Sequence, residues 1–168
     1  FILFLHPFFA ECQVTKVLFI GNSYTGVNNL PSLVQDVALA NGDTLIVDSY
    51  VPGGYAFENH YADASTAAKI FSQQWDYVIL QEQSQRPGLS PNSVSVWVYP
   101  YAEILDSMIL ENNPCTETVF YMTWGRENGD TTYCPYYPPI CTYEGMHSRI
   151  RETYLEMALL NHATVSPV

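Results

Sequence analysis

The segment VLFIGNS, residues 17–23, joins four apolar residues to a glycine, an asparagine and a serine. A continuous apolar run of this kind is typical of a parallel strand that is buried on both faces. Apolar residues at helical spacing follow over residues 30–40, where Pro31 suits a first helical turn and Asn41-Gly42 is a stop signal. The segment therefore predicts a buried strand, then a turn that carries Ser23, then a helix.

The same alternation of strand and helix continues along the chain. Further strands are predicted over residues 44–51, 75–80 and 118–123 and from residue 163 onward, and helices over 62–74, 96–111 and 143–161. Strands that alternate with helices need crossover connections, which place helices on both faces of a parallel sheet. We therefore expect a three-layer α/β/α domain with a parallel sheet of five strands.

The composition fits one globular domain and argues against nucleic acid as a partner. The chain has 168 residues, of which 48% are hydrophobic, enough to bury a single core. It carries 17 Asp and Glu residues against 6 Lys and Arg residues, a formal net charge of -11. Because binding to a phosphate backbone depends on clustered positive charge, we expect no nucleic-acid partner.

The N-terminal stretch FILFLHPFFA, residues 1–10, is typical of the remnant of a secretory signal peptide. It has an apolar core, a proline and a small residue, and cleavage after Ala10 is expected. The alternative is a buried N-terminal strand. The run is too short to span a membrane, which takes about 20 residues. We expect a secreted or periplasmic protein without a membrane span.

The four cysteines are Cys12, Cys115, Cys134 and Cys141. Cys134 and Cys141 flank the short, proline-rich segment PYYPPI, and we predict that a disulfide closes this loop. Cys12 and Cys115 either pair or stay free. No C-x-x-C or H-x-x-x-H spacing occurs, so we expect neither a metal site nor a cofactor.

Polar or glycine residues follow the first three predicted strands, at the edge where parallel strands place their ligands. Ser23 follows the first strand, Gly53-Gly54 the second, and Gln81 and Gln83 the third. A hydroxyl, a backbone N–H freed of a side chain and an amide donor are the groups that acyl transfer needs. Taken singly, each has an ordinary alternative, namely a helix cap, a simple turn or a loop hydrogen bond. Their convergence favours a functional site.

Four residues are predicted to contact a substrate: Asn22, Gln81, Trp124 and His60. Trp124 follows the fourth strand and is placed to stack on a sugar ring. His60 lies in the second connection, where a structural role is the alternative.

These segments resemble the SGNH, or GDSL-like, hydrolases. Residues 17–25, VLFIGNSYT, are similar to the first block of that superfamily, with G-N-S in place of G-D-S. Residues 75–84, WDYVILQEQS, are similar to a segment of an uncharacterised, mostly bacterial branch, as are Thr123-Trp124 and the closing VSPV. The resemblance implies a flavodoxin-like SGNH hydrolase fold over residues 14–168.

The resemblance also implies ester hydrolysis through a serine acyl-enzyme. Ser23 matches the nucleophile, and Gly54 (or Gly53) matches the glycine whose N–H binds the oxyanion. Gln83 falls where most of the superfamily has the asparagine of G-x-N-D, and Gln81 is the alternative amide donor. The backbone N–H of Ser23 would complete the oxyanion hole. The implied substrate is a small-molecule or carbohydrate ester, including a carbohydrate acetyl ester.

The sequence departs from the superfamily pattern at its end. The resemblance implies a final D-x-x-H block after the fifth strand, whereas this sequence ends at Val168, inside that strand. None of the histidines suits the role of general base. We therefore expect a C-terminally truncated domain that is weakly active or inactive alone. The alternative is a non-catalytic module that binds a glycan or another small molecule on the same fold.

Overall fold

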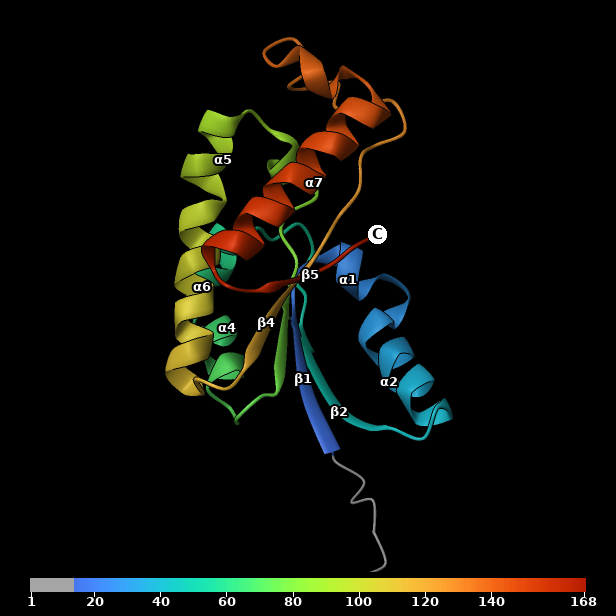
Figure 1. Cartoon of the computed structure of the whole chain (residues 1–168), viewed down its shortest axis with the longest axis vertical. Coiled ribbons are helices and arrows are strands. Elements are labelled where there is room, and N and C mark those ends of the chain that lie inside the picture. The colour runs from blue at the N-terminus through green and yellow to red at the C-terminus, as the bar shows by residue number, and fades with distance from the viewer. Residues whose placement is uncertain (1–13) are drawn as a thin grey trace, which may run out of the picture.

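The computed structural model describes residues 14–168, and its framework is a five-stranded parallel sheet (Figure 1). The strands are β1 (Val14–Ile20), β2 (Thr44–Tyr50), β3 (Tyr77–Leu80), β4 (Glu117–Tyr121) and β5 (Thr164–Ser166). Their order is β2-β1-β3-β4-β5, and each neighbouring pair is parallel. The predicted parallel sheet is confirmed. The predictions for residues 1–10 and Cys12 lie outside the described residues.

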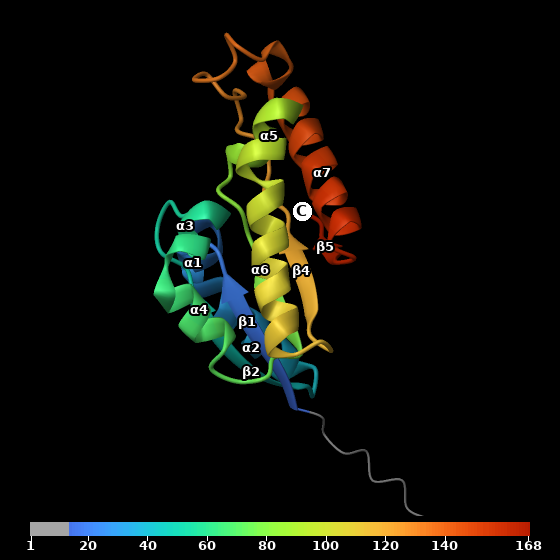
Figure 2. The ribbon, with the colours of Figure 1, turned by 90° about the vertical axis from the view of Figure 1, so that its left-hand side faces the viewer.

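Helices cover both faces of the sheet. They are α1 (Ser23–Gly26), α2 (Leu30–Ala40), α3 (Phe57–Ala62), α4 (Ala64–Ile70), α5 (Pro91–Trp97), α6 (Tyr99–Asn112) and α7 (Tyr143–Leu160). Figure 1 shows α1 and α2 on one side of the sheet and α4, α5 and α6 on the other. Figure 2 shows α6 lying along β4, with α7 beside it. No helix within residues 14–168 has the length and apolar character needed to cross a bilayer.

The helix predicted over residues 62–74 is the shorter helix α4, and a separate helix, α3, precedes it and ends just before Asp63. The backbone of Asp63 is extended, with φ -100° and ψ 114°, and its side chain accepts a 2.8 Å bond from the N–H of Ser65. The hydroxyls of Tyr50 and Tyr55 donate to the same carboxylate at 2.6 and 3.3 Å. These bonds lower the pKa of Asp63 to about 2. Asp63 therefore caps the N-terminus of α4. Because a cap residue has a non-helical backbone, α3 and α4 are separate helices.

The helix predicted over residues 96–111 also differs from the structure. It begins at Tyr99 as α6, and the separate helix α5 precedes it. Ser90 caps α5 by accepting a hydrogen bond from the N–H of Ser93 at 3.3 Å, and Pro91 occupies the first helical position. Serine followed by proline is an ordinary helix start, so this signal was present in the sequence.

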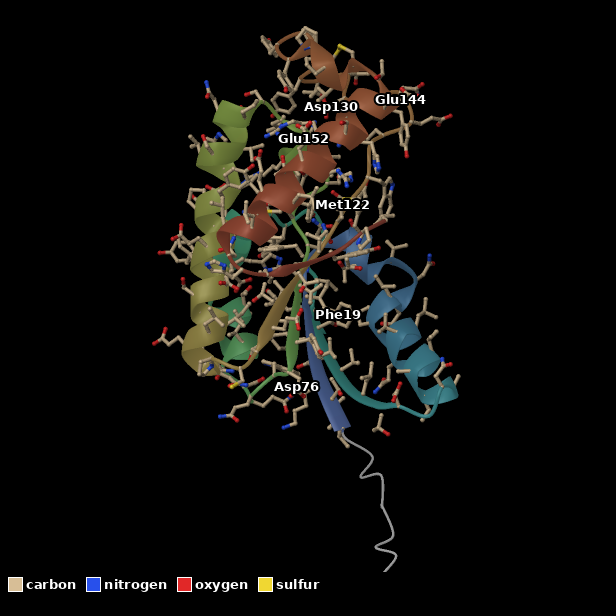
Figure 3. The ribbon with its side chains drawn as sticks, in the orientation of Figure 1. Phe19, Asp76, Met122, Asp130, Glu144 and Glu152 are labelled. Carbon is tan, nitrogen blue, oxygen red and sulfur yellow. A yellow bond between two sulfur atoms is a disulfide. The ribbon has the colours of Figure 1, made fainter. Side chains whose placement is uncertain are left out.

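The core forms where the strands pack on α4, α6 and α7. The strand side chains on this face are fully buried: Leu18, Ile20, Val78, Leu80 and Phe120. Phe19, which alternates with them in β1, lies on the face that carries α2 (Figure 3). Because all five strands are parallel, their carboxyl ends meet at one edge. Between β1 and β3 the strand order reverses, since β2 is added on one side of β1 and β3 on the other, and open α/β sheets bind ligands at such a switch point.

Candidate active site

Ser23 is exposed at the carboxyl end of β1, where it opens the short helix α1. The preceding residue, Asn22, caps this helix, since its side-chain oxygen accepts a 3.0 Å bond from the N–H of Tyr24. The N–H groups of a first helical turn have no partner within the helix. The Ser23 hydroxyl and its backbone N–H therefore both sit on an accessible turn, which meets the first requirement for a nucleophile.

Asn22 lies beneath this turn and is 2% exposed. Its side-chain amide donates to the carbonyl oxygen of Tyr55 at 2.7 Å, and its backbone N–H donates to Oε1 of Gln81 at 3.1 Å. The polar groups of Asn22 thus join the loop after β1 to the loops after β2 and β3. The structure shows these groups bonded within the chain, and the contact of Asn22 with substrate stays a prediction.

Gln81 is fully buried, and both ends of its amide are engaged. Its oxygen accepts from the N–H of Asn22 and, at 2.9 Å, from the hydroxyl of Thr25. Its nitrogen donates to the carbonyl oxygen of Glu82. A Cβ atom on Gly21 would lie 2.8 Å from the Gln81 oxygen, so this contact requires glycine. Gln81 is therefore a structural residue and offers no donor to a substrate.

Gln83, two residues further along, differs from Gln81 because, in the described part of the chain, only one end of its side-chain amide is hydrogen-bonded. Its side-chain oxygen accepts from the N–H groups of Gln85 and Arg86 at 2.7 and 3.1 Å. Its side-chain nitrogen has no hydrogen-bond partner among residues 14–168. Gln83 lines a cavity of about 490 Å³ together with Gly54. Of the two candidate amides, Gln83 is the one with a donor directed to a cavity.

Gly54 lies on the exposed loop between β2 and α3. Its φ is +76°, while an added Cβ atom would meet nothing within 4 Å. Glycine is needed here for the backbone conformation rather than for space. Gly53 has no such requirement, because its φ is not positive. The loop is held next to Ser23, since the Tyr55 carbonyl accepts the bond from Asn22.

Ser23 and Trp124 line a second hollow, of about 440 Å³. Its other lining side chains are mainly apolar and include Leu30, Leu33 and Tyr121. The Trp124 ring packs on Tyr24 with 4.9 Å between centroids and remains 37% exposed. The structure thus places Gly54 and Gln83 at one hollow and Ser23 and Trp124 at another, and Asn22 bonds the loop of Ser23 to the loop after β2 and the loop after β3.

His60 is fully buried, and both ring nitrogens are bonded. Nε2 donates to the carbonyl oxygen of Gly21 at 2.9 Å, so Nδ1 is the acceptor from the hydroxyl of Thr66 at 3.0 Å. Burial lowers the pKa of His60 to about 4. The structure gives His60 the structural place that was its alternative, because the buried ring bonds to the turn before Ser23, and a contact with substrate stays a prediction.

No histidine within residues 14–168 hydrogen-bonds to Ser23. His147 stacks on Tyr143 in α7, with ring centroids 5.5 Å apart, and Nδ1 of His147 is buried without a partner. His162 lies beside Cys115 in a separate hollow. Nor does the described part of the chain hold three or more His, Cys, Asp or Glu side chains arranged for a metal ion.

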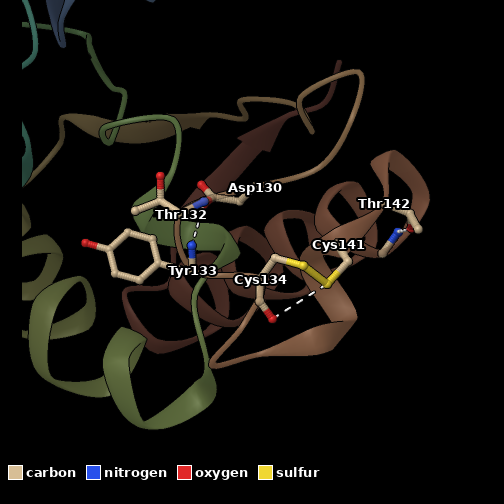
Figure 4. The surroundings of a disulfide bond; sticks show 7 residues. Asp130, Thr132, Tyr133, Cys134, Cys141 and Thr142 are labelled. Atoms are coloured by element: carbon tan, nitrogen blue, oxygen red, sulfur yellow. Dashed lines mark hydrogen bonds between the residues drawn. A yellow bond between two sulfur atoms is a disulfide. The ribbon is translucent and has the colours of Figure 1, made fainter.

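The long segment between β4 and α7 contains the predicted disulfide between Cys134 and Cys141, whose Cα atoms are 4.9 Å apart (Figure 4). It closes the short loop between these two residues. Cys115 is free and exposed. Asp130 is fully buried in the same segment and accepts from the N–H groups of Thr132 and Tyr133 at 2.9 and 2.8 Å. Tyr133 contributes a wall to the cavity of Gly54 and Gln83.

Asp130 and Glu82 belong to the site region, and neither was assigned a role from the sequence. The Asp130 carboxylate also accepts bonds from the side chains of Gln85 and Arg126, the latter at 3.2 Å, so it ties the loop after β4 to the loop after β3. The one signal for Glu82 was its place between Gln81 and Gln83.

Solved structures with a similar backbone identify the fold. A protein from Slackia heliotrinireducens classed as an SGNH hydrolase matches with a TM-score of 0.69 and 22% identity, over 91% of this chain and 78% of that chain. The chain has the SGNH hydrolase fold. The predicted fold class is therefore confirmed.

Other solved structures match over a similar length. A DUF4886 family protein from Bacteroides uniformis gives a TM-score of 0.72 at 19% identity, over 92% of this chain and 67% of that chain. A variant of an acetyl xylan esterase from Geobacillus stearothermophilus gives a TM-score of 0.57 at 17% identity, over 91% and 76%. No protein-family model and no curated protein matches the sequence.

Proposed function

We propose that this protein is a serine esterase, in which the Ser23 hydroxyl attacks the carbonyl carbon of an oxygen ester. The alcohol then leaves, and water hydrolyses the acyl-enzyme to free the acid and restore the serine. The observation that carries the proposal is an exposed serine at the β1–β3 switch point, linked through Asn22 to the loop of Gly54. The SGNH hydrolase fold supports the same reaction.

The proposed hydrogen-bond donors to the oxyanion come from residues of both hollows. The backbone N–H of Gly54 and the side-chain nitrogen of Gln83 are the proposed donors, since both residues line one cavity. The N–H of Ser23 itself is the third. Donors held in place before the reaction stabilise the developing charge without having to reorganise.

The substrate class proposed is an ester of a hydroxyl-rich compound such as an acetylated carbohydrate. The cavity of Gly54 and Gln83 is lined by polar side chains, among them Asn59, Gln85 and Ser93, which suit hydroxyl groups. Trp97 and Tyr133 add aromatic surface. Acetyl xylan esterases are among the proteins of similar structure, which favours the same kind of ester.

The general base is proposed to come from a D-x-x-H segment, as the resemblance implies. Residues 1–168 contain no such segment, and no described histidine bonds to Ser23. Residues 1–168 alone would then be weakly active, because the hydroxyl keeps its proton. An exported location is also proposed, since the Cys134–Cys141 disulfide suits an oxidising compartment.

The test is hydrolysis of p-nitrophenyl acetate and of acetylated xylan by the longest natural polypeptide that contains this sequence. We expect Ser23→Ala to lower kcat/KM at least about 1,000-fold, since the nucleophile is lost. Ser72→Ala is the matched control, because Ser72 is an exposed serine in the turn after α4. Full activity of Ser23→Ala would contradict the proposal. Binding of a glycan without turnover in either form would favour the binding module instead.

A further inference from the structure

Glu82 is a fully buried carboxyl group at the end of β3, between the two glutamines. The N–H of Phe57 donates to its two oxygens at 3.1 and 3.3 Å. The N–H of Gln83 donates to Oε1 at 2.5 Å. Every bond to the carboxyl group therefore comes from the backbone, and the side chain has no atom open to a substrate.

These bonds connect the two loops that carry the proposed oxyanion donors. Phe57 opens α3, three residues after Gly54, and Gln83 follows Glu82 directly. Gly54 and Gln83 line the same cavity. The Glu82 carboxyl group is therefore hydrogen-bonded to both loops.

The rest of the Gly54 loop is held by two further bonds. The side chain of Asn59 accepts from the N–H of Ala56 at 2.9 Å, and Asn22 donates to the carbonyl of Tyr55 at 2.7 Å. Glu82 is the residue of this set that also bonds to the Gln83 backbone. It is therefore the one direct connection, among these three side chains, between the two donor loops.

The charged and titratable groups near the Glu82 carboxyl are Arg86, Glu58 and Tyr154. Arg86 and Glu58 form an ion pair at 2.8 Å, and the Tyr154 oxygen accepts from the Glu82 backbone N–H at 3.3 Å. Burial raises the pKa of Glu82 to about 8, while the Gln83 N–H, Arg86 and the Phe57 N–H oppose this shift. The ionised carboxylate accepts all of the backbone bonds, whereas the protonated form has one oxygen occupied by hydrogen.

We infer that Glu82 is a positioning residue that fixes the separation of the Gly54 N–H and the Gln83 amide across the oxyanion site. The inference rests on the proposed esterase function. The carboxyl group acts through its bonds to the N–H groups of Phe57 and Gln83. Its removal therefore leaves both oxyanion donors in the protein but displaces them. Misplacement by about 1 Å can cost on the order of 100-fold in rate.

The test compares Glu82→Gln with Glu82→Leu in the longest natural polypeptide. Glutamine has the same shape and keeps an acceptor oxygen for both N–H groups, so kcat should stay within about threefold. Leucine fills the space without an acceptor, so kcat should fall about 10- to 100-fold while KM changes little. In the wild type, kcat should rise as the pH passes about 8, because the carboxyl group ionises there and both of its oxygens can accept bonds. Glu82→Gln should show no such rise.

Thr116→Val is the matched control for a lost buried hydrogen bond. The Thr116 hydroxyl donates to the carbonyl of Trp75 at 2.6 Å, at the opposite edge of the sheet, and Thr116 is 5% exposed. Its kcat should equal that of the wild type. If Glu82→Leu also keeps the wild-type kcat, the positioning role is wrong.

A second readout is independent of catalysis. Amide hydrogen exchange, followed by NMR, should be faster at Phe57 and Gln83 in Glu82→Leu than in Glu82→Gln or Thr116→Val. If the wild type has no Ser23-dependent activity, the esterase proposal fails, and this exchange still decides whether Glu82 holds the two loops. If Glu82→Leu does not fold, Glu82→Asp replaces it. Its shorter carboxylate should raise exchange at one of the two amides, and unchanged exchange at both would overturn the inference.

Discussion

Two groups of residues at the carboxyl edge of the sheet differ in what their polar atoms bind. The buried polar layer consists of Asn22, His60, Gln81 and Glu82, and its polar atoms bond within the chain. The rim consists of Ser23, Gly54, Gln83 and Trp124, which line the two hollows. The comparison shows that adjacent residues of one motif divide into side chains that are bonded within the protein and side chains that face a hollow, because buried polar groups must be bonded and exposed ones need not be.

The glutamines give the sharpest form of this comparison and, after the loss of the Ser23 hydroxyl, the largest expected effect on activity. We expect Gln83→Ala to lower kcat about 100- to 1,000-fold, as removal of one oxyanion donor does. The free energy of unfolding should fall by only about 1 kcal/mol, since the two N–H groups that lose their acceptor, those of Gln85 and Arg86, are only partly buried. Gln81→Ala should instead lower the free energy of unfolding by about 2–4 kcal/mol, because it orphans the buried N–H of Asn22 and hydroxyl of Thr25.

Steady-state kinetics and urea unfolding on the two variants separate these roles. Gln83→Glu serves as a further control, since it keeps the side-chain oxygen that accepts from Gln85 and Arg86 but loses the amide donor. It should be as inactive as Gln83→Ala. An active Gln83→Ala, or a Gln81→Ala that loses kcat without losing stability, would reverse the assignment of the two amides.

The strands of the sheet could be predicted from the sequence more accurately than the division of the polar residues into the buried polar layer and the rim. The strands follow from continuous apolar runs such as residues 17–20, whose pattern depends on local burial alone. The predictions for Ser23 and Gln83 follow from their position at strand ends. The sequence did not reveal that Asn22 and His60 bond to Tyr55 and Gly21, because these partners are distant in the sequence. A pattern of residue types does not reveal which polar group finds a buried partner.

His60 gives the next largest expected effect, on stability and its pH dependence. Burial lowers its pKa from 6.5 to about 4, so the unfolded chain binds the proton more readily between these values. The stabilising contribution is fully present above pH 6.5 and is lost as the pH falls toward 4. The expected loss is about 3 kcal/mol.

The measurement is the difference in unfolding free energy between the wild type and His60→Gln, from pH 4 to 8. Taking the difference removes the opposite trend of Glu82, whose raised pKa weakens stability as the pH rises toward about 8. The difference should grow from pH 4 to 6.5 and stay level above that. A flat difference throughout would mean that the His60 ring is protonated as easily in the folded chain as in the unfolded one.

The Cys134–Cys141 disulfide should have the smallest effect on activity, although it lies in the segment that forms part of the rim cavity. Closing a loop of this length stabilises a fold by about 2–3 kcal/mol, so Cys134→Ser with Cys141→Ser should lower the thermal midpoint. Tyr133 stays in place in this variant, because its backbone N–H remains bonded to the buried Asp130. We therefore expect kcat/KM to change less than about threefold. Cys115→Ser, which removes an exposed free thiol, is the control for the serine substitution itself. If the double variant instead lost activity as strongly as Gln83→Ala, the cavity wall would depend on the covalent link, and Asp130 would not suffice to hold the rim.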